Sequence, residues 1–285
     1  MAVIIGLVVV LGCVITGFMM AGGHVGALLH VSEFITIGGA SLGAMIIMSP
    51  KKVLIDVIKS TLGLLKGSPY GKATCIEMCE LLSEIARMMR RDGILALDAH
   101  ISNPHESTLF KKYPRLHKNH HAIEFLCTGM TLIVDGKAQP AQLMAALEEE
   151  IKVIEREHHA ATGILAKTAD GLPGFGIVAA VLGIVVTMGA LDGPASEIGH
   201  KVGTALVGTF LGILLSYGFF GPMAARMELM GETELNFFRG ISGAIVALSE
   251  GGTPTEVVVR ARRAMGTDCR PTQREMAKIL KSAAA

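Results

Sequence analysis

The chain has 285 residues, of which 51% are hydrophobic, and its 26 Lys and Arg residues nearly balance its 25 Asp and Glu residues. This apolar composition is unusual for a soluble protein and indicates a membrane protein, while the neutral balance gives no support for nucleic-acid binding. The five cysteines are never spaced as CxxC, so neither a disulfide framework nor a thiolate zinc site is indicated. No phosphate-binding loop or nucleophile motif is present, so the sequence offers no enzyme.

Two uncharged apolar runs near the start of the sequence predict membrane-spanning helices, because a hydrocarbon core about 30 Å thick needs about 20 helical residues. Ala2 to Met20 is uninterrupted. We interpret it as a retained span, because no Lys or Arg precedes it and it is too long for the apolar core of a signal peptide. Phe34 to Met48 is shorter, and the 21–33 stretch before it, which includes Glu33, is assigned to a loop outside the membrane.

The 51–170 segment that follows is too long to be a loop without structure of its own. It carries apolar residues at helical spacing at 53–65, 75–89 and 142–165, and a capping box at Thr253 predicts a further helix near the C-terminus. Seven histidines occur in the segment, including His117 and His120. None has the spacing of HExxH or of a zinc finger, so we favour solvated histidines and predict no metal site.

Two later apolar runs, Leu172 to Leu191 and Val202 to Phe220, predict a third and a fourth span. Lys51 and Lys52 follow the second run and Arg226 follows the fourth, so the positive-inside rule puts both termini in the cytoplasm. We therefore predict an all-α integral membrane protein of four transmembrane helices with a large helical cytoplasmic domain. Its segments are spans one and two with a short outer loop (1–50), the cytoplasmic helical domain (51–170), spans three and four with a short outer loop (171–223), and the C-terminal cytoplasmic helices (224–285).

Glycine is frequent in all four predicted spans. Small residues let helix backbones approach in lipid, and Gly39 with Gly43, and Gly208 with Gly212, form GxxxG pairs. The pattern predicts close packing of several helices, although for any single pair an ordinary membrane glycine is an equally good interpretation.

Asp, Glu, Lys, Arg and His are all missing from the four predicted spans, whose polarity is limited to hydroxyl groups. Because an ion path normally carries ionisable groups, a partner would have to supply the titrating carboxylate while this chain lines the path. Thr209 lies near the expected depth, and the alternative is that its hydroxyl bonds to its own helix. Pro173 and Pro222 stand at the inner ends of the last two spans, where a helix start and a kink or end explain them adequately.

Several stretches carry a resemblance to a known family. They are LPGFGIVAAVLG at 172–183, VGTFLGILLSYGF at 207–219, RRDGILALD at 90–98 and NPHES at 103–107. Together with the spacing of the spans and the long cytoplasmic insertion, they resemble MotA, the family of flagellar-motor stator A subunits, over almost the whole chain. That family lies in the bacterial inner membrane and has no cofactor other than the transported ion.

The resemblance implies a pentamer of this chain around two copies of a MotB-like subunit, whose transmembrane Asp binds the ion. It implies that Arg90 and Asp98 contact FliG, the switch-ring protein of the rotor, with Asp98 standing where the family often has the longer Glu. It also assigns Pro173 and Pro222 to the coupling of ion flow to movement. Finally, it assigns Thr209 and Ala180 to the lining of the ion path. Sodium-driven relatives tend to carry Thr at the position of Ala180, so we expect the ion to be a proton.

Three other classes remain open at this stage. The nearest is an energising subunit of the ExbB/TolQ kind, which usually has three spans rather than four. A stand-alone transporter would be expected to carry an intramembrane charge or a broken helix with internal repeats. A membrane anchor or signalling scaffold would conduct no ions when a B-type partner is added.

Overall fold

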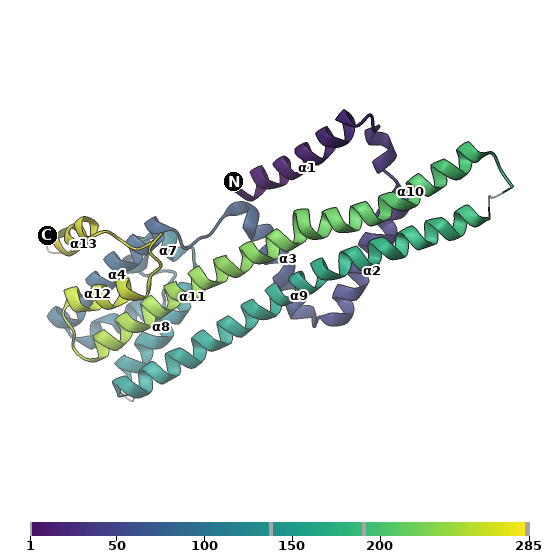
Figure 1. Ribbon diagram of the computed structural model, residues 1–285. Coiled ribbons are helices and arrows are strands. Elements are labelled where there is room, and N and C mark those ends of the chain that lie inside the picture. Colours follow the sequence, from purple (N-terminus) through teal and green to yellow (C-terminus); the bar gives the residue numbers. More distant parts are fainter. Residues whose placement is uncertain (1, 137–138, 190–191, 283–285) are drawn as a thin grey trace. The chain divides into compact units, whose positions relative to one another are not determined.

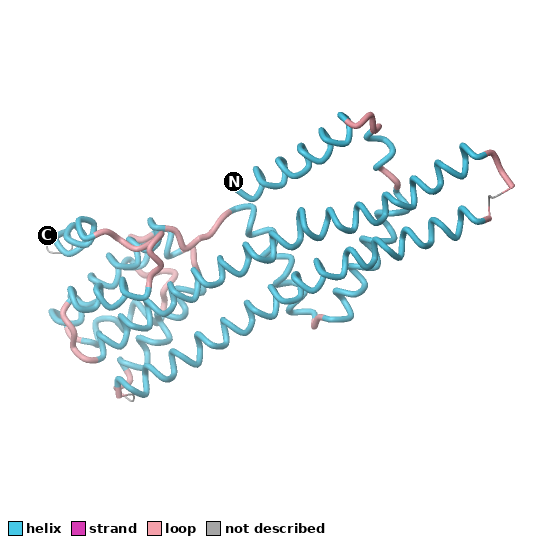
Figure 2. Tube along the Cα trace, viewed as in Figure 1, coloured by secondary structure: helices cyan, strands magenta, loops and turns pink. Residues whose placement is uncertain are grey.

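The computed structural model describes residues 2–136, 139–189 and 192–282, and every regular element among them is a helix (Figure 2). The chain divides into two compact units. One, here called the span unit, combines the residues up to Gly67 with Glu157–Leu229. The other, here called the core unit, combines Ser68–Arg156 with the residues from Met230 onward.

The span unit contains the long apolar helices (Figure 1). Four stretches among the described residues are long and apolar enough to cross a membrane, in agreement with the four predicted spans. The elements are α1 (Ala2–Met20), η1 (Val25–Leu28), α2 (Val31–Met48), α3 (Lys51–Lys66), the later part of α9 (Pro140–Met188), α10 (Ala195–Ile213), η3 (Leu214–Phe220) and the first part of α11 (Gly221–Ser249).

Apolar side chains cover the outside of these helices. Within this chain α1 has no buried residue, and large side chains such as Ile5 and Ile47 are 63% and 87% exposed. A helix that is apolar on all sides needs lipid or other protein around it, because exposing its apolar surface to water is unfavourable. The span unit therefore presents surfaces suited to a bilayer and to other chains.

The core unit is built around one apolar cluster. Cys75, Met78 and Leu82 lie on the buried face of α4, and the rings of Phe125 on α8 and Phe238 on α11 meet edge to face with their centroids 5.1 Å apart. Such burial is the main favourable term in folding. The elements are α4 (Lys72–Asp92), η2 (Ile94–Leu97), α5 (Asp98–Ser102), α6 (Thr108–Lys111), α7 (Pro114–His117), α8 (His120–Val134), the start of α9, the rest of α11, α12 (Pro254–Ala264) and α13 (Gln273–Ser282).

Two capping boxes fix the C-terminal helices. The predicted one, in which Thr253 and Glu256 bond to each other's backbone N–H, opens α12. A second box, which the sequence reading missed, joins Thr272 and Glu275 at the start of α13. Lys72 of α4 also pairs with Glu275 at 2.9 Å, so the same carboxylate caps α13 and holds it to α4.

Helix boundaries differ from the sequence expectation in three places. The prediction that a helix starts at Pro173 is wrong, because α9 continues through this proline. A proline inside a helix removes one hydrogen bond, a loss that neighbouring membrane helices can tolerate. Helix α2 begins at Val31 and α10 at Ala195, each earlier than the charge-free runs indicated. The predicted end of the third span at Leu191 lies outside the described residues.

Candidate functional site

Helices α9 and α10 pack backbone to backbone. A Cβ added to Gly176 would lie 2.9 Å from the carbonyl oxygen of Gly208 and 3.1 Å from the Cα of Gly212. Only glycine fits such spacing, so the prediction that Gly208 and Gly212 permit a close approach is confirmed. A Cβ on Gly39 or Gly43 would meet no described atom within 4 Å, so this second pair lies on an open face of the chain.

The close contact brings the two predicted path-lining residues together. The backbone nitrogen of Ala180 would be 3.3 Å from a Cβ on Gly208, and the Cα of Thr209 would be 3.3 Å from a Cβ on Gly176. Ala180 is 8% exposed, whereas Thr209 is half-buried. The two residues therefore lie at the α9–α10 contact, where the backbones rather than long side chains set their separation.

The hydroxyl of Thr209 is not used in its own helix. Thr187 and Thr204 each donate to the carbonyl four residues earlier, at 2.8 Å and 3.1 Å. Thr209 forms no hydrogen bond with any residue in the described part of the chain, so the back-bonding alternative is not what the structure contains. Its hydroxyl is free for water, an ion or another chain.

A buried carboxylate lies beside this contact. Glu33 is in the first turn of α2, is 6% exposed, and its Oε2 atom has no hydrogen-bond partner among the described residues. Oε2 would be 2.6 Å from a Cβ on Gly208. The expectation that Glu33 lies in a loop before the second helix is therefore wrong. The missed signal was the i, i+4 spacing of Glu33 with Ile37 and Ser41, which are the buried residues of α2.

The two predicted coupling prolines stand in different settings. Pro173 is a half-buried residue inside α9. Pro222 is exposed and is the second residue of α11, directly after the wide helical turns of η3. There the N–H of Gly221 reaches back to the carbonyl of Ser216, five residues earlier. A proline cannot donate to the carbonyl four residues before it, and wide turns of this kind often mark functional sites.

Arg90 and Asp98 flank a short exposed turn of the core unit. Arg90 lies in the last turn of α4, which ends at Asp92, and Asp98 begins α5; the side chains of Arg90 and Asp98 are both exposed. Gly93 has a φ of +83°, a left-handed value that favours glycine, and Leu95 after it is 74% exposed. Arg90 forms no ion pair with a described residue, although the hydrogen bonds of the α12 capping box and, to a lesser degree, the Arg90 charge lower the pKa of the exposed Glu256 carboxyl.

Two descriptions of known protein families match parts of this chain. Residues 4–93 match a family described as "Motility protein A N-terminal", and residues 117–239 match the "MotA/TolQ/ExbB proton channel family". Motility protein A of Salmonella typhimurium is 34% identical over 272 residues, which cover 95% of this chain and 92% of that protein. Chemotaxis protein LafT of Vibrio parahaemolyticus is 35% identical and covers 97% of each chain. The chain belongs to the motility protein A family.

A solved structure gives the same fold for this motility protein A family member. The structure of C. jejuni MotAB has a TM-score of 0.79 at 23% identity and covers 95% of this chain and 98% of the other. The sequence-based expectation of the family is therefore confirmed. The roles that the resemblance gave to single residues, namely Thr209, Ala180, Pro173, Pro222, Arg90 and Asp98, stay predictions.

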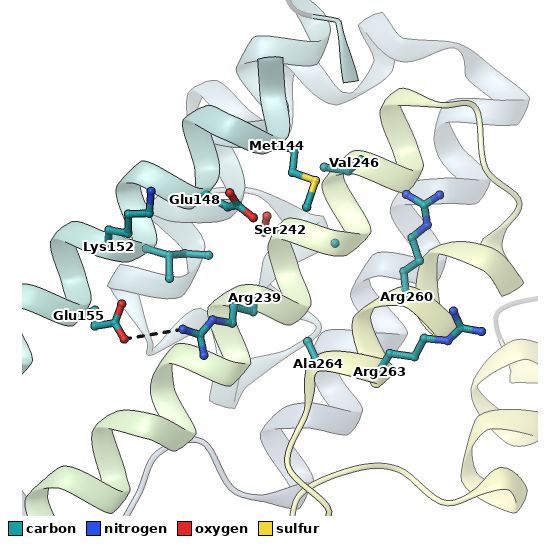
Figure 3. Close-up of a pocket in the computed structure, with 12 residues that line it drawn as sticks. Met144, Glu148, Lys152, Glu155, Arg239, Ser242, Val246, Arg260, Arg263 and Ala264 are labelled. Atoms are coloured by element: carbon teal, nitrogen blue, oxygen red, sulfur yellow. Dashed lines mark ion pairs between the residues drawn. The ribbon is translucent and has the colours of Figure 1, made fainter. Parts of the chain in front are cut away.

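The core unit also has a groove of about 740 Å³ between α9, α11 and α12 (Figure 3). Arg239 in this groove points to Glu155, with 3.8 Å between their charged atoms (Figure 3). Arg260, another lining residue, pairs with Glu250 at 2.6 Å. Arg239 and Arg260 are thus paired within the chain, whereas Arg263, which also lines the groove, forms no ion pair with a described residue.

Histidines cluster elsewhere in the core unit. The ring centroid of His105 lies 5.9 Å from that of His117 and 5.0 Å from that of His120. Among the described residues no group of three or more His, Cys, Asp or Glu side chains is placed to hold a metal ion. Burial lowers the pKa of His117, and the neighbouring His105, Lys111 and His120 lower it further.

Proposed function

We propose that this member of the motility protein A family is the A subunit of a flagellar-motor stator. It forms an ion channel with a B-type partner and converts ion flow into torque on the rotor. The observation that carries the proposal is similarity to motility protein A along almost the whole chain, joined to four helices able to span a membrane. The α9–α10 contact then supplies a place for the ion path.

The partner is a MotB-like subunit, present as two copies within a pentamer of this chain. The relatives of known structure support a partner of this kind, since they are described as MotAB and, in Bacillus subtilis, as the flagellar MotAB stator complex. Among the described residues α1 has no buried side chain, and a Cβ on Gly39 or Gly43 would meet open space. Small-residue faces of this kind suit contacts between helices of separate chains in lipid.

The transported ion is a proton, and the chain needs no cofactor. Ala180 supports this choice because its methyl group, buried at the α9–α10 contact, offers no oxygen to a cation. Sodium is a hard cation that needs oxygen ligands, whereas a proton needs only a carboxylate and water. The hydroxyl of Thr209, which has no partner within the described chain, lines the path opposite the carboxylate of the B subunit.

The core unit is a cytoplasmic domain, both termini are cytoplasmic, and the protein lies in the bacterial inner membrane. Lys51 and Lys52 begin α3 directly after the second span, and Arg226 follows the fourth, as the positive-inside rule expects for cytoplasmic ends. In this orientation the turn with Arg90 and Asp98 faces the rotor and contacts FliG. Arg90 carries the positive charge that the resemblance implies at this position. Asp98 carries the implied negative charge on a side chain shorter than the Glu that the family often has there.

The mechanism is a charge switch. When the B-subunit carboxylate takes up a proton from outside it loses its attraction to polar groups, moves relative to the ring of A subunits, and releases the proton inside. Each proton supplies about 2.3 kcal/mol per 100 mV of membrane potential, so many must pass in one motor turn. Pro173 and Pro222 transmit this movement, because a proline and the wide turns of η3 are places where a helix bends easily.

An ExbB/TolQ-like energising role is the runner-up, and it is separable by experiment. This chain with its cognate B subunit is expressed in cells that lack their own stator and in cells that lack their ExbB or TolQ protein. Restored swimming in the first strain alone is expected. Rescue of only the second strain would overturn the stator proposal.

A further inference from the structure

The end of α2 opposite Lys51 carries a group of protonatable side chains that the proposed mechanism does not use. His30 comes directly before α2 and Glu33 lies in its first turn, while His200 and Thr204 lie on α10. His30 Nε2 is 3.2 Å from the Thr204 hydroxyl, and the rings of His30 and His200 have centroids 6.4 Å apart. We call these four residues the outer cluster.

The outer cluster continues into the α9–α10 contact. His200, Thr204 and Gly208 follow one another at intervals of four residues, so they share one face of α10. Glu33 lies against Gly208 on that face, and Gly208 in turn contacts the backbone of Ala180. Protonatable groups are therefore arranged in order from the helix end towards the predicted path-lining residues.

A cavity lies beside three of the four residues of the outer cluster. It has a volume of about 550 Å³ and is lined by His30, His200 and Thr204 together with apolar side chains such as Phe18 and Phe210. A space of this size that also holds several polar groups can contain ordered water. Water in the cavity would connect the two imidazoles with the surface.

Two atoms of the outer cluster are buried without a partner among the described residues, namely His30 Nδ1 and Glu33 Oε2. An ionised carboxylate inside a membrane needs a proton or a cation, and ionisable residues in spans usually mark ion pathways. The nearby charges do not meet this need, because Lys201 is paired with Glu197 at 2.9 Å. The cavity residues contributed by α1 and η1 are apolar, and α9 offers alanines.

We propose that Glu33 is a proton-binding residue of the A subunit and that His30 and His200 deliver protons to it from the outer surface. This inference rests on the proposed function, in which protons pass between this chain and its partner. An imidazolium N–H gives its proton to the Glu33 carboxylate, leaving neutral imidazole and a carboxylic acid. The acid then gives the proton to the B-subunit carboxylate, and a hydronium ion from outside protonates the imidazole again and leaves water.

The test is the speed of single motors at low load, in stator-deleted cells that carry the full chain and its cognate B subunit. We expect Glu33→Gln to lower this speed by about ten-fold, because water can replace only part of what a positioned proton-transfer group contributes. Glu33→Asp should recover part of the speed. Asp192→Asn, which changes an exposed carboxylate just before α10 and leaves the Lys201–Glu197 pair in place, should turn at wild-type speed.

Delivery by the histidines is tested in the same assay. The double variant His30→Gln/His200→Gln should also be slow, and adding Glu33→Gln should cause no further loss because all three groups serve one path. Additive losses would overturn delivery by the histidines.

Membrane level and co-purification with the B subunit are measured for every variant. If Glu33→Gln does not assemble, Glu33→Met takes its place. Wild-type speed in an assembled Gln or Met variant, with the wild-type chain restoring rotation, would overturn the role of Glu33 while leaving the proposed function intact. Failure of the wild-type chain to restore rotation would instead overturn the proposed function.

Discussion

Gly176 on α9 and Gly208 on α10 are in backbone contact, since a Cβ on Gly176 would lie 2.9 Å from the carbonyl oxygen of Gly208. The contact fixes the positions of Thr209 and Ala180 along the helix pair. Thr209 directly follows Gly208, and the backbone of Ala180 faces Gly208. Packing that depends on backbone approach has no flexible side chain to absorb a change. The geometry of the candidate ion path is therefore sensitive to a single methyl group.

Gly176→Ala is expected to destabilise the protein by about 1–3 kcal/mol, the usual cost of overpacking a filled contact. Thermal unfolding of the detergent-purified chain measures this loss. Gly163→Ala is the matched control on the same helix, because a Cβ there meets no described atom within 4 Å. Equal unfolding temperatures for the two variants would contradict the contact.

Thr209→Val should abolish or strongly reduce rotation, because valine keeps the shape and removes the free hydroxyl. Thr209→Ser should retain rotation. Thr187→Val serves as the control, since the Thr187 hydroxyl already donates to Gly183 within α9. Torque of single motors is the measurement, and a Thr209→Val motor with normal torque would remove this hydroxyl from the path.

Arg90→Glu is expected to impair swimming while leaving assembly with the B subunit intact, because the side chain is exposed and the change breaks no ion pair with a described residue. Lys118→Glu changes an exposed charge elsewhere in the core unit and should swim normally. Swarm-plate diameter and co-purification are the measurements. Normal swimming by Arg90→Glu would exclude Arg90 from torque transfer.

Much of this architecture follows from the sequence alone. The four apolar runs, the helical segment between them and the capping box at Thr253 were predicted correctly, because hydropathy, spacing and local hydrogen bonding determine them. From Gly208 and Gly212 the sequence predicted that α10 would pack closely against another helix. Its partner, Gly176, could not be assigned, because a glycine pattern does not say which helices meet.

Glu33 and Pro173 show where sequence reasoning failed. Because only charge-free residues were counted, the predicted second span began at Phe34 and left out Glu33, although helix α2 includes this residue and buries its side chain. Treating proline as a helix boundary divided α9 at Pro173, although the helix continues. In both cases tertiary packing overrides a local rule, since neighbouring helices cover the carboxylate and tolerate the missing hydrogen bond.

Acidification should destabilise the region around His117. The pKa of His117 is lowered by its surroundings in the folded chain, so the unfolded chain binds more protons. Stability from the neutral ring is fully present above the unfolded pKa of about 6.5 and is lost as pH falls through the lower folded value. Chemical unfolding of the purified chain at ~pH 7.5 and ~pH 5 measures the effect, because histidine changes charge in this range.

His117→Gln should reduce this loss of stability, whereas the exposed His121→Gln should not. A wild-type chain that is equally stable at both pH values, or more stable in acid, would show that His117 is not held neutral by its surroundings.

The central claim is that this chain turns proton flow into rotation. It is tested most directly by the swimming speed of a stator-deleted cell that carries the chain and its cognate B subunit, first with sodium removed and then with a protonophore added. The account predicts that speed survives sodium removal and collapses with the protonophore. Swimming that requires sodium would contradict the argument from Ala180, and no swimming under any condition would contradict the stator function itself.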